Sequence, residues 1–282
     1  MKNIAYYNGK TSLIEEMTVP MNDRACYFGD GVYDVSYVFN HVPMAIEEHI
    51  DRIYRSASLI DIKIPQTKEW FKQMLMALVN QVEGDSLILY FQVSRGIAPR
   101  GHDYTALSGG PSIWAYVKLA QLIDAYQSYR GITLEDKRFF FCHIKTINLL
   151  PSVLANHQAH AAGAEEAILH RGDRVTEGSH SNISILKNGV FQTAPLDELI
   201  LPGITRAHVI RICNRLGIPV KEEPFTLREM MEADEVFFTA SGALCCRFDT
   251  IDGIPVGGKD MKTFSAIRDA YEAERKQECG LI

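Results

Sequence analysis

The sequence reads HIKTINLL over residues 143–150 and TEGSHSN over residues 176–182, and these two stretches decide the fold. The first holds a single lysine, Lys145, flanked by the apolar Ile144 and Ile147 with no acidic neighbour. Such surroundings suit a partly desolvated amine, which can form a Schiff base. The second is an acidic turn that places a carboxylate and several polar donors at the end of a strand. Together they indicate an imine-cofactor site, although each alone also fits a solvated edge lysine or a polar hairpin.

Length and composition favour two domains and exclude several classes of protein. The chain has 282 residues, of which 46% are hydrophobic, so it can bury a sizeable core. Its net charge of −6 gives no general attraction to nucleic acid or to anionic membranes. No apolar run approaches the roughly 20 residues of a membrane span, and the N-terminus does not open a secretory signal. We therefore expect a cytoplasmic protein without membrane or nucleic-acid partners.

The six cysteines lack the spacing of a metal site or a redox motif. Cys245 and Cys246 are adjacent in sequence, so a disulfide between them would be strained. We interpret all six as reduced thiols and expect no metal.

Hydrophobic patterning predicts a small α+β domain over residues 1–119, a linker over 120–130 and a second domain over 131–282. In the first domain, helical spacing is found around residues 50–57 and 70–79, the latter with Thr67 as a cap, and buried strands are predicted at 87–93 and 113–117.

In the second domain, turn signals at Gly172-Asp173 and Asn188-Gly189 predict antiparallel hairpins. Helices are expected over 151–162 and 206–216, and Thr226 with Glu229 fits a capping box that begins another helix.

Further motifs extend the pattern along the chain. They are RACYFGDGVY at 24–33, EHIDR at 48–52, LPGITR at 201–206 and FTAS at 238–241. With the Lys145 and Glu177 segments, these motifs make the chain resemble the fold-type IV pyridoxal-phosphate enzymes, most closely the D-amino acid aminotransferases. The resemblance covers nearly the whole chain. It implies an α+β fold with a small α/β N-terminal domain and a β-pseudobarrel C-terminal domain, with pyridoxal 5′-phosphate in the cleft between them.

The resemblance also implies roles for individual residues. Lys145 would form the Schiff base and then carry a proton between the substrate Cα and the cofactor C4′. Glu177 would hold the pyridine nitrogen protonated, so that the ring withdraws electrons. The N–H groups at the start of the helix after Gly203 suit an anion. The resemblance assigns the cofactor phosphate to that helix start and to other motif residues, namely Arg52, Ile204, Thr205, Ala240 and Ser241.

Substrate class depends on a further segment, SRGIAPRGH at residues 94–102. Arg100 and His102 follow Pro99 on a constrained loop, and a guanidinium matches a carboxylate through two hydrogen bonds. In D-amino acid aminotransferases a similar stretch holds the substrate α-carboxylate across a dimer, together with a tyrosine. Here these residues would be Arg100, His102 and Tyr33. The alternative interpretation is a basic surface loop.

Two departures from the related families bear on the substrate. Branched-chain enzymes usually carry a tyrosine in a GYxEA-like stretch, whereas this chain reads GAEEA at residues 163–167. The phenol that contacts the cofactor's phenolic oxygen is therefore absent from this stretch. His143 also stands where D-amino acid enzymes often carry an aspartate.

We expect a homodimeric aminotransferase that uses pyridoxal 5′-phosphate to exchange the amino group between a D-amino acid and a 2-oxo acid, either 2-oxoglutarate or pyruvate. The alternatives on the same scaffold are a branched-chain aminotransferase, an (R)-amine aminotransferase and an aminodeoxychorismate lyase. A non-catalytic homologue is a more remote alternative. The Arg100 and His102 pair separates these possibilities, because a simple amine offers no carboxylate to bind.

Overall fold

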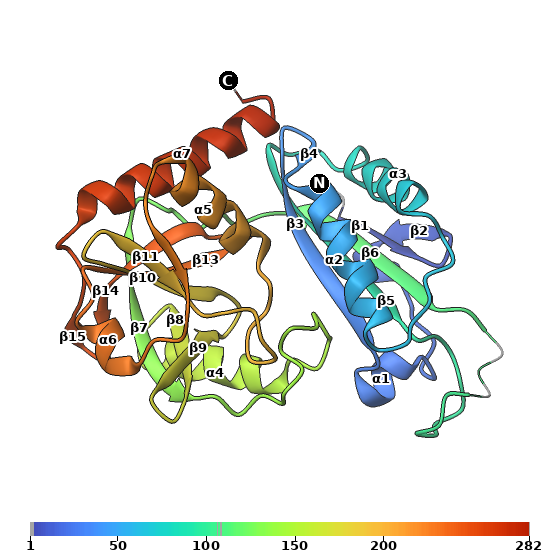
Figure 1. Ribbon diagram of the computed structural model, residues 1–282. Helices are drawn as coiled ribbons and strands as arrows, with labels where there is room; N and C mark the ends of the chain where they lie inside the picture. The colour runs from blue at the N-terminus through green and yellow to red at the C-terminus, as the bar shows by residue number, and fades with distance from the viewer. Residues whose placement is uncertain (1–2, 106, 108, 282) are drawn as a thin grey trace. The chain divides into compact units, whose positions relative to one another are not determined.

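A computed structural model describes residues 3–105, 107 and 109–281, and the chain divides into two compact units (Figure 1). The first unit comprises Met1–Gln121, Ile144–Asn148 and Gln277–Ile282, and the second comprises Leu122–His143 and Leu149–Lys276.

These boundaries correct the continuous C-terminal domain predicted over 131–282. Two short segments inside that range, Ile144–Asn148 and Gln277–Ile282, fold with the first unit. The predicted linker over 120–130 is also too long, because strand β7 (Ser128–Glu135) begins within it. The cause is long-range backbone bonding, since segment 144–148 pairs with a strand more than a hundred residues earlier in the chain.

The first unit is built on a six-stranded antiparallel sheet. Its strand order is β2-β1-β6-β5-β3-β4. The strands are β1 (Ile4–Tyr7), β2 (Lys10–Leu13), β3 (Gly31–Phe39), β4 (Val42–Pro43), β5 (Ser86–Ser94) and β6 (Ser112–Leu119). The strands predicted at 87–93 and 113–117 are confirmed as β5 and β6.

Two amphipathic helices supply apolar side chains to the core of this unit. They are α2 (Ile46–Ser58) and α3 (Lys68–Val79), and the Thr67 hydroxyl accepts the Trp70 N–H at the start of α3, as predicted. Ile50 and Leu75 are fully buried in one core with Leu89 of β5. A short 3-10 helix, η1 (Ile14–Glu16), and helix α1 (Arg24–Phe28) complete the unit.

The second unit is built on a nine-stranded mixed sheet. Its order is β12-β11-β10-β13-β14-β7-β8-β9, and β15 pairs with β14. In addition to β7, the strands are β8 (Glu166–Arg171), β9 (Arg174–Gly178), β10 (Asn182–Lys187), β11 (Val190–Thr193), β12 (Val220–Glu222), β13 (Glu235–Ala240), β14 (Leu244–Ile251) and β15 (Ile254–Pro255).

The predicted hairpins are confirmed, since β8 pairs with β9 and β10 with β11 in antiparallel fashion. The prediction missed the parallel pairs, which join β7 to β8, β14 to β7, and β11 to β12. Parallel pairing requires a long crossover, so no tight turn marks it in the sequence.

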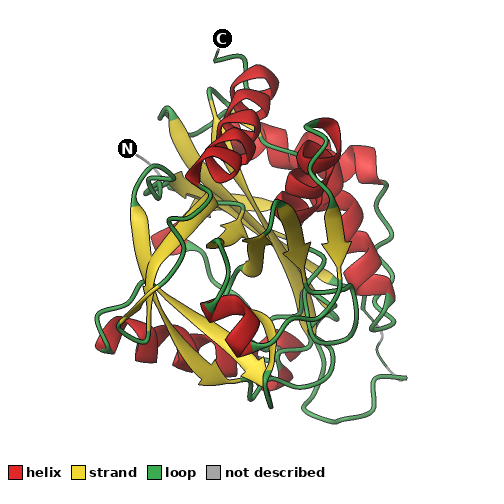
Figure 2. Cartoon of the chain, turned by 60° about the vertical axis from the view of Figure 1, so that its left-hand side comes forward, coloured by secondary structure: helices red, strands yellow, loops and turns green. Residues whose placement is uncertain are grey.

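Helices of the second unit lie close to the ranges predicted from the sequence. They are α4 (Leu150–Ala161), α5 (Ile204–Arg215) and α6 (Leu227–Met231), and α6 begins with the predicted capping box of Thr226 and Glu229. The long helix that ends beside the C-terminus in Figure 2 is α7 (Met261–Glu278), which was not predicted. Its Phe264 lies 5.3 Å from Phe237 of β13, measured between ring centroids.

Candidate active site

Lys145 lies in an extended segment that is pinned to strand β3. The Tyr33 N–H donates to the Lys145 carbonyl at 2.9 Å, and the Ile147 N–H donates to the Gly31 carbonyl at 3.1 Å. From the other side, the Lys145 N–H donates to the Ser56 hydroxyl of α2 at 3.3 Å. Backbone bonds on both sides of the segment therefore hold the Cα of Lys145 in place, and its side chain is half-buried.

The Lys145 amine and the Tyr33 ring lie together. The Nζ atom is 4.4 Å from the Tyr33 ring centroid, a favourable cation–π distance. Tyr33 in turn stacks on Tyr90 at 5.6 Å, and Tyr90 stacks on Tyr116 at 4.9 Å. The column of tyrosines fixes the Tyr33 ring and therefore limits where the amine can go.

Arg52 lies on α2 and is buried against Asp34 of β3. Its Nε donates to Asp34 Oδ2 at 2.8 Å and its Nη2 to Oδ1 at 2.6 Å, a bidentate ion pair. His49 Nδ1 lies 2.7 Å from the same Oδ1. Burial by itself raises the pKa of the Asp34 carboxyl, but Arg52 and His49 outweigh it and hold that pKa well below its usual value. Burial lowers the pKa of His49, outweighing the Asp34 carboxylate.

We expect Asp34→Asn to lower the free energy of unfolding by about 3–5 kcal/mol, because it leaves the buried Arg52 without its counter-ion. Both pKa shifts predict acid lability of the wild type. A group whose pKa is lower in the folded chain stabilises the fold above its unfolded value and loses that effect as the pH falls. The loss of folding stability should begin below pH ~6.5, as His49 becomes protonated on unfolding, and should continue below pH ~4, as Asp34 does.

Urea unfolding at several pH values measures both effects. The control is Asp51→Asn, which removes an exposed ion pair with Lys68 at 2.8 Å. A wild-type stability that does not change between pH 7 and 4 would contradict the predicted linkage.

Arg100 and His102 gather around one aromatic ring, that of Phe28. The Arg100 Cζ lies 5.2 Å from the Phe28 ring centroid, and the His102 ring lies 5.3 Å from it. The buried Arg24 binds the loop that carries Arg100 and His102. Its Nη1 donates to the Gly101 carbonyl at 2.6 Å, and its Nε donates to Asp30 at 2.7 Å. Arg100 and His102 therefore lie on a loop that Arg24 holds in place. A guanidinium beside an imidazole can bind a carboxylate.

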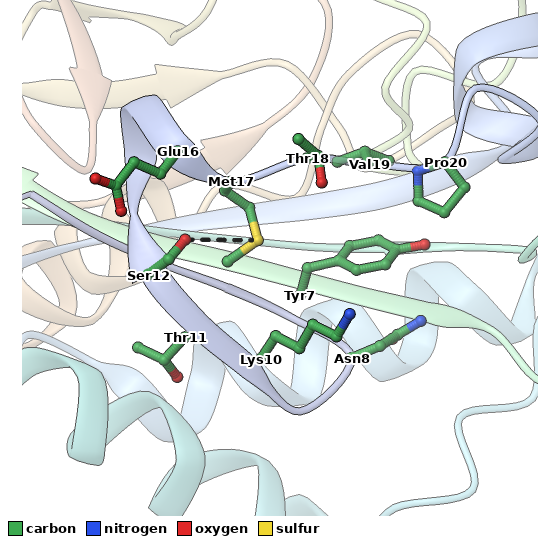
Figure 3. A pocket seen from close by; sticks show the side chains of 10 residues that line it. All are labelled: Tyr7, Asn8, Lys10, Thr11, Ser12, Glu16, Met17, Thr18, Val19 and Pro20. Atoms are coloured by element: carbon green, nitrogen blue, oxygen red, sulfur yellow. Dashed lines mark hydrogen bonds between the residues drawn. The ribbon is translucent and has the colours of Figure 1, made fainter.

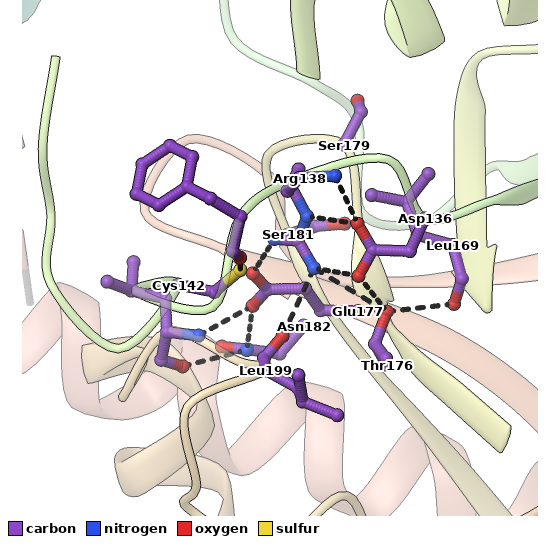
Figure 4. Close-up of polar contacts among 12 residues, drawn as sticks. Asp136, Arg138, Cys142, Leu169, Thr176, Glu177, Ser179, Ser181, Asn182 and Leu199 are labelled. Carbon is purple, nitrogen blue, oxygen red and sulfur yellow. Dashed lines mark hydrogen bonds and ion pairs between the residues drawn. The ribbon is translucent and has the colours of Figure 1, made fainter. Parts of the chain in front are cut away.

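Glu177 is a buried carboxylate at the end of β9, held by donors from several segments (Figure 4). Its Oε2 accepts the Asn182 amide at 3.0 Å and the Leu201 N–H at 2.8 Å. Its Oε1 is paired with the Arg138 guanidinium. These contacts fix the carboxylate in position.

The start of helix α5 offers backbone N–H donors beside Asn182, which binds the Glu177 carboxylate. Gly203 is its N-cap, with no side-chain cap and no acidic residue in the first turn, so the N–H groups of Ile204 and Thr205 have no intrahelical acceptor. A Cβ on Gly203 would come 2.0 Å from the Asn182 Oδ1, so the close approach requires glycine. The helix start is therefore packed directly on the residue that binds Glu177.

Strand β13 ends next to Asn182, with Thr239 opposite Asn182 in the sheet register. The Thr239 hydroxyl is buried and, within the described part of the chain, has no hydrogen-bond partner. Ala240 is the last residue of β13, and Ser241 follows it in a turn. An unsatisfied buried hydroxyl at this position suits a polar ligand.

The sequence profile of the amino-transferase class IV family matches residues 31–251 of the chain. The chain belongs to this family. D-alanine aminotransferase from Listeria monocytogenes is 41% identical over 271 residues, which cover 94% of each protein. D-alanine aminotransferase from Staphylococcus aureus is 37% identical over 270 residues, covering 95% of this chain and 96% of that protein.

Among solved structures, the branched-chain aminotransferase from Thermoproteus uzoniensis, determined with norvaline, matches with a TM-score of 0.88 and 27% identity. The match covers 98% of this chain and 95% of that one. The resemblance to fold-type IV enzymes and the predicted two-domain α+β fold are therefore confirmed.

Class IV aminotransferases depend on pyridoxal 5′-phosphate, and the residues present in this aminotransferase fit that group. A buried carboxylate at Glu177 suits a protonated ring nitrogen, and the uncapped start of α5 suits a phosphate. The predicted site residues divide between the units. Tyr33, Arg52, Arg100, His102 and Lys145 belong to the first, and Glu177, Ile204, Thr205, Ala240 and Ser241 belong to the second.

Further observations concern features outside the candidate site. A hollow of about 620 Å³ lies at the β1–β2 hairpin, lined by Lys10, Glu16 and Met17 among others (Figure 3). None of the predicted site residues lines it.

The described residues include no cluster of three or more side chains able to bind a metal, and none of their helices is long and apolar enough to cross a membrane. All six cysteines are free thiols, as predicted.

Sequence reasoning missed the residues that hold Glu177 and the loop of Arg100. Asn182 was part of the quoted TEGSHSN stretch but had no assigned role, and its position five residues after Glu177 was the available signal. The roles of Arg138 and Arg24 had no local signal, because the groups they hold, Glu177 and the Gly101 carbonyl, lie 39 and 77 residues away in the chain.

Proposed function

We propose that this enzyme transfers the amino group between a D-amino acid and a 2-oxo acid, with 2-oxoglutarate or pyruvate as acceptor. The observation that carries the proposal is the placement of Arg100 and His102 around the Phe28 ring, a trap for a substrate carboxylate. The D-alanine aminotransferases at 37–41% identity support the same substrate class.

The residues of this chain would divide the work as follows. Arg100, His102 and the Tyr33 hydroxyl bind the α-carboxylate and orient the substrate Cα. The Lys145 amine then removes the proton from Cα and returns it at the adjacent position. Bound pyridoxal phosphate supplies an electron-withdrawing ring that stabilises the carbanion left by this proton transfer.

The remaining residues would hold the cofactor. Glu177 binds the ring nitrogen and keeps it protonated. We assign the phosphate to backbone groups of Ile204, Thr205 and Ala240, to the guanidinium of Arg52, and to the hydroxyls of Thr205 and Ser241. The uncapped first turn of α5 supports this assignment.

The alternatives on this scaffold are less well supported. The branched-chain enzyme is 27% identical, compared with 41% for the Listeria D-alanine aminotransferase. A simple amine substrate offers no carboxylate for Arg100 and His102 to bind, and the GAEEA stretch at 163–167 lacks the tyrosine typical of branched-chain enzymes.

The substrate assignment predicts the effect of Arg100→Ala. We expect KM for D-alanine to rise by an amount equivalent to about 2–5 kcal/mol, since a charge-assisted contact is lost and the substrate carboxylate is left unpaired. The half-reaction with (R)-1-phenylethylamine, measured without a 2-oxo acid, should change little because this amine has no carboxylate. Initial rates with D-alanine, L-leucine and this amine measure both, and Arg55→Ala, which removes an exposed arginine, is the control. Wild-type preference for L-leucine or for the amine would overturn the D-amino acid assignment.

We also propose a homodimer in which each carboxylate trap serves the neighbouring subunit. Several apolar side chains of the second unit are more than half exposed and would be buried by association, namely Phe140, Phe141, Leu150, Val153 and Leu154. A cytoplasmic location stays a prediction.

Subunit sharing predicts complementation between two variants that are each defective at low D-alanine concentration. Mixing Arg100→Ala with Lys145→Ala protein under conditions of subunit exchange should restore about one quarter of wild-type activity, because half of the dimers are hybrids and each hybrid has one intact site. Sedimentation and labelled-subunit exchange confirm mixing. Full exchange without recovered activity would show that the trap acts within its own subunit.

A further inference from the structure

Glu177 is the first member of a row of alternating charges in the second unit, and Figure 4 shows it with the next two members, Arg138 and Asp136. The charge row consists of Glu177, Arg138, Asp136 and Arg171. Their side chains are 7%, 10%, 0% and 18% exposed, in that order. Two negative and two positive charges alternate, so the row is neutral as a whole.

The guanidinium of Arg138 is bound more extensively to Asp136 than to Glu177. Its Nε donates to Asp136 Oδ1 at 2.9 Å and its Nη2 to Oδ2 at 2.8 Å, whereas one nitrogen, Nη1, reaches Glu177. The same Nη2 also donates to the Leu199 carbonyl at 3.1 Å. Arg138 is therefore fixed by Asp136 and presents a single N–H to Glu177.

Arg171 closes the far end of the row. Its Nε donates to Asp136 at 3.2 Å and its Nη2 to the Arg138 carbonyl at 2.8 Å. Thr176 is next to Glu177 in β9, and its hydroxyl donates to the Asp136 carboxylate at 3.1 Å. Asp136 is thus the centre of the network, and it lies on the loop directly after β7.

We propose that the charge row adjusts how strongly Glu177 attracts the proton of the cofactor's pyridine nitrogen. This inference rests on the proposed role of Glu177. Arg138 orients the Glu177 carboxylate, and Asp136 offsets the Arg138 charge, so that a second cation, the protonated pyridine, can approach the same carboxylate. Arg138 and Asp136 are positioning residues, because they act through Glu177.

The charge of Arg138 needs to be offset because Arg138 and the protonated pyridine are two cations that would approach the same carboxylate, and like charges repel at short range. An uncompensated guanidinium on Glu177 would repel a pyridinium there, and in a poorly hydrated interior that repulsion is strong. Pairing with Asp136 and Glu177 raises the pKa of Arg138 despite its burial, and the Arg138 contacts lower the pKa of Asp136 despite its burial. Cys142 also faces this region, but burial raises its pKa to about 11, so the neutral thiol adds no charge.

The charge row predicts opposite effects for its two middle members. Asp136→Asn removes the compensating charge and should move the titration of the pyridine nitrogen to lower pH by about one pH unit or more. Arg138→Met removes the opposing cation, so the nitrogen should stay protonated to at least as high a pH as in the wild type. The double variant Asp136→Asn/Arg138→Met removes one charge of each sign and should return the titration toward the wild-type position.

The measurement is the ¹⁵N chemical shift of labelled cofactor bound to each variant, followed across pH. Activity is a second readout, with kcat of Asp136→Asn expected to fall about tenfold or more near neutral pH and to recover in the double variant. Arg130→Gln is the matched control, since it removes an exposed arginine of β7 paired with Glu165. Near-UV circular dichroism verifies the fold of each protein.

The outcomes separate the inference from the function on which it rests. If Glu177→Gln leaves the nitrogen signal unchanged, the proposed role of Glu177 is wrong. If Glu177→Gln changes the signal but Asp136→Asn does not, or shifts it to higher pH, the charge row has no tuning role. Should Arg138→Met alone not fold, the comparison of Asp136→Asn with the double variant still decides, because a purely structural defect would not be reversed by a second substitution.

Discussion

Replacement of Lys145 by alanine is expected to abolish transamination while leaving the fold intact. The substitution removes both the amine that binds the cofactor and the base that moves the substrate proton, so the rate should fall by at least about 10⁴-fold. The fold should survive, because the segment is held through its backbone, by Tyr33 and Ser56, and not through the lysine side chain.

Single-turnover assays and the visible absorbance of the bound cofactor measure the loss, and circular dichroism measures the fold. The matched control is Lys118→Ala. Lys118 lies at the other end of the tyrosine column, with its Nζ 5.7 Å from the Tyr116 ring centroid, but it is exposed and has no proposed catalytic role. Turnover by Lys145→Ala at the wild-type rate would refute the assignment, and an equal loss in Lys118→Ala would attribute the effect to the column instead.

Replacement of Glu177 by glutamine is expected to retain the bound cofactor but to lower kcat roughly 10²–10³-fold, the range measured when one preorganised electrostatic contact is removed. The uncharged amide no longer favours a protonated ring nitrogen, so the ring withdraws electrons less strongly. Binding should be affected less than rate, because the phosphate contacts proposed at the start of α5 are untouched.

Cofactor content after gel filtration and steady-state rates distinguish the two effects. Glu165→Gln is the control, because the same substitution is made at a glutamate that forms a surface ion pair, with Arg130 at 2.8 Å. A wild-type kcat in Glu177→Gln would mean that another group holds the ring nitrogen.

Local sequence was sufficient wherever one short segment contains all the chemistry. Thr226 and Glu229 form their predicted capping box, because both partners lie within one turn of helix. The Asn188-Gly189 turn forms the predicted hairpin because these residues adopt the left-handed backbone conformation, with φ of 51° and 73°. The uncapped glycine start of α5 could likewise be predicted from LPGITR.

The candidate site was predictable as a set of residues but not as a set of contacts. Lys145 and Glu177 were recognisable from their motifs, and Arg100 and His102 from their spacing after Pro99. That Arg52 pairs with Asp34, and that Phe28 lies between Arg100 and His102, depends on how β3, α2 and α1 pack within the first unit.

Sequence alone thus determined the family and its cofactor, and it supplied the candidates for the reacting side chains, because each depends on residue type at fixed local spacing. Tertiary structure alone decided that Lys145 folds with the first unit and that Glu177 belongs to a buried charge row with Arg138 and Asp136. The reason is that a carboxylate or a guanidinium has the same local pattern whether it is solvated or buried. Only the long-range pairing of strands removes water from these groups and determines which opposite charge each one meets.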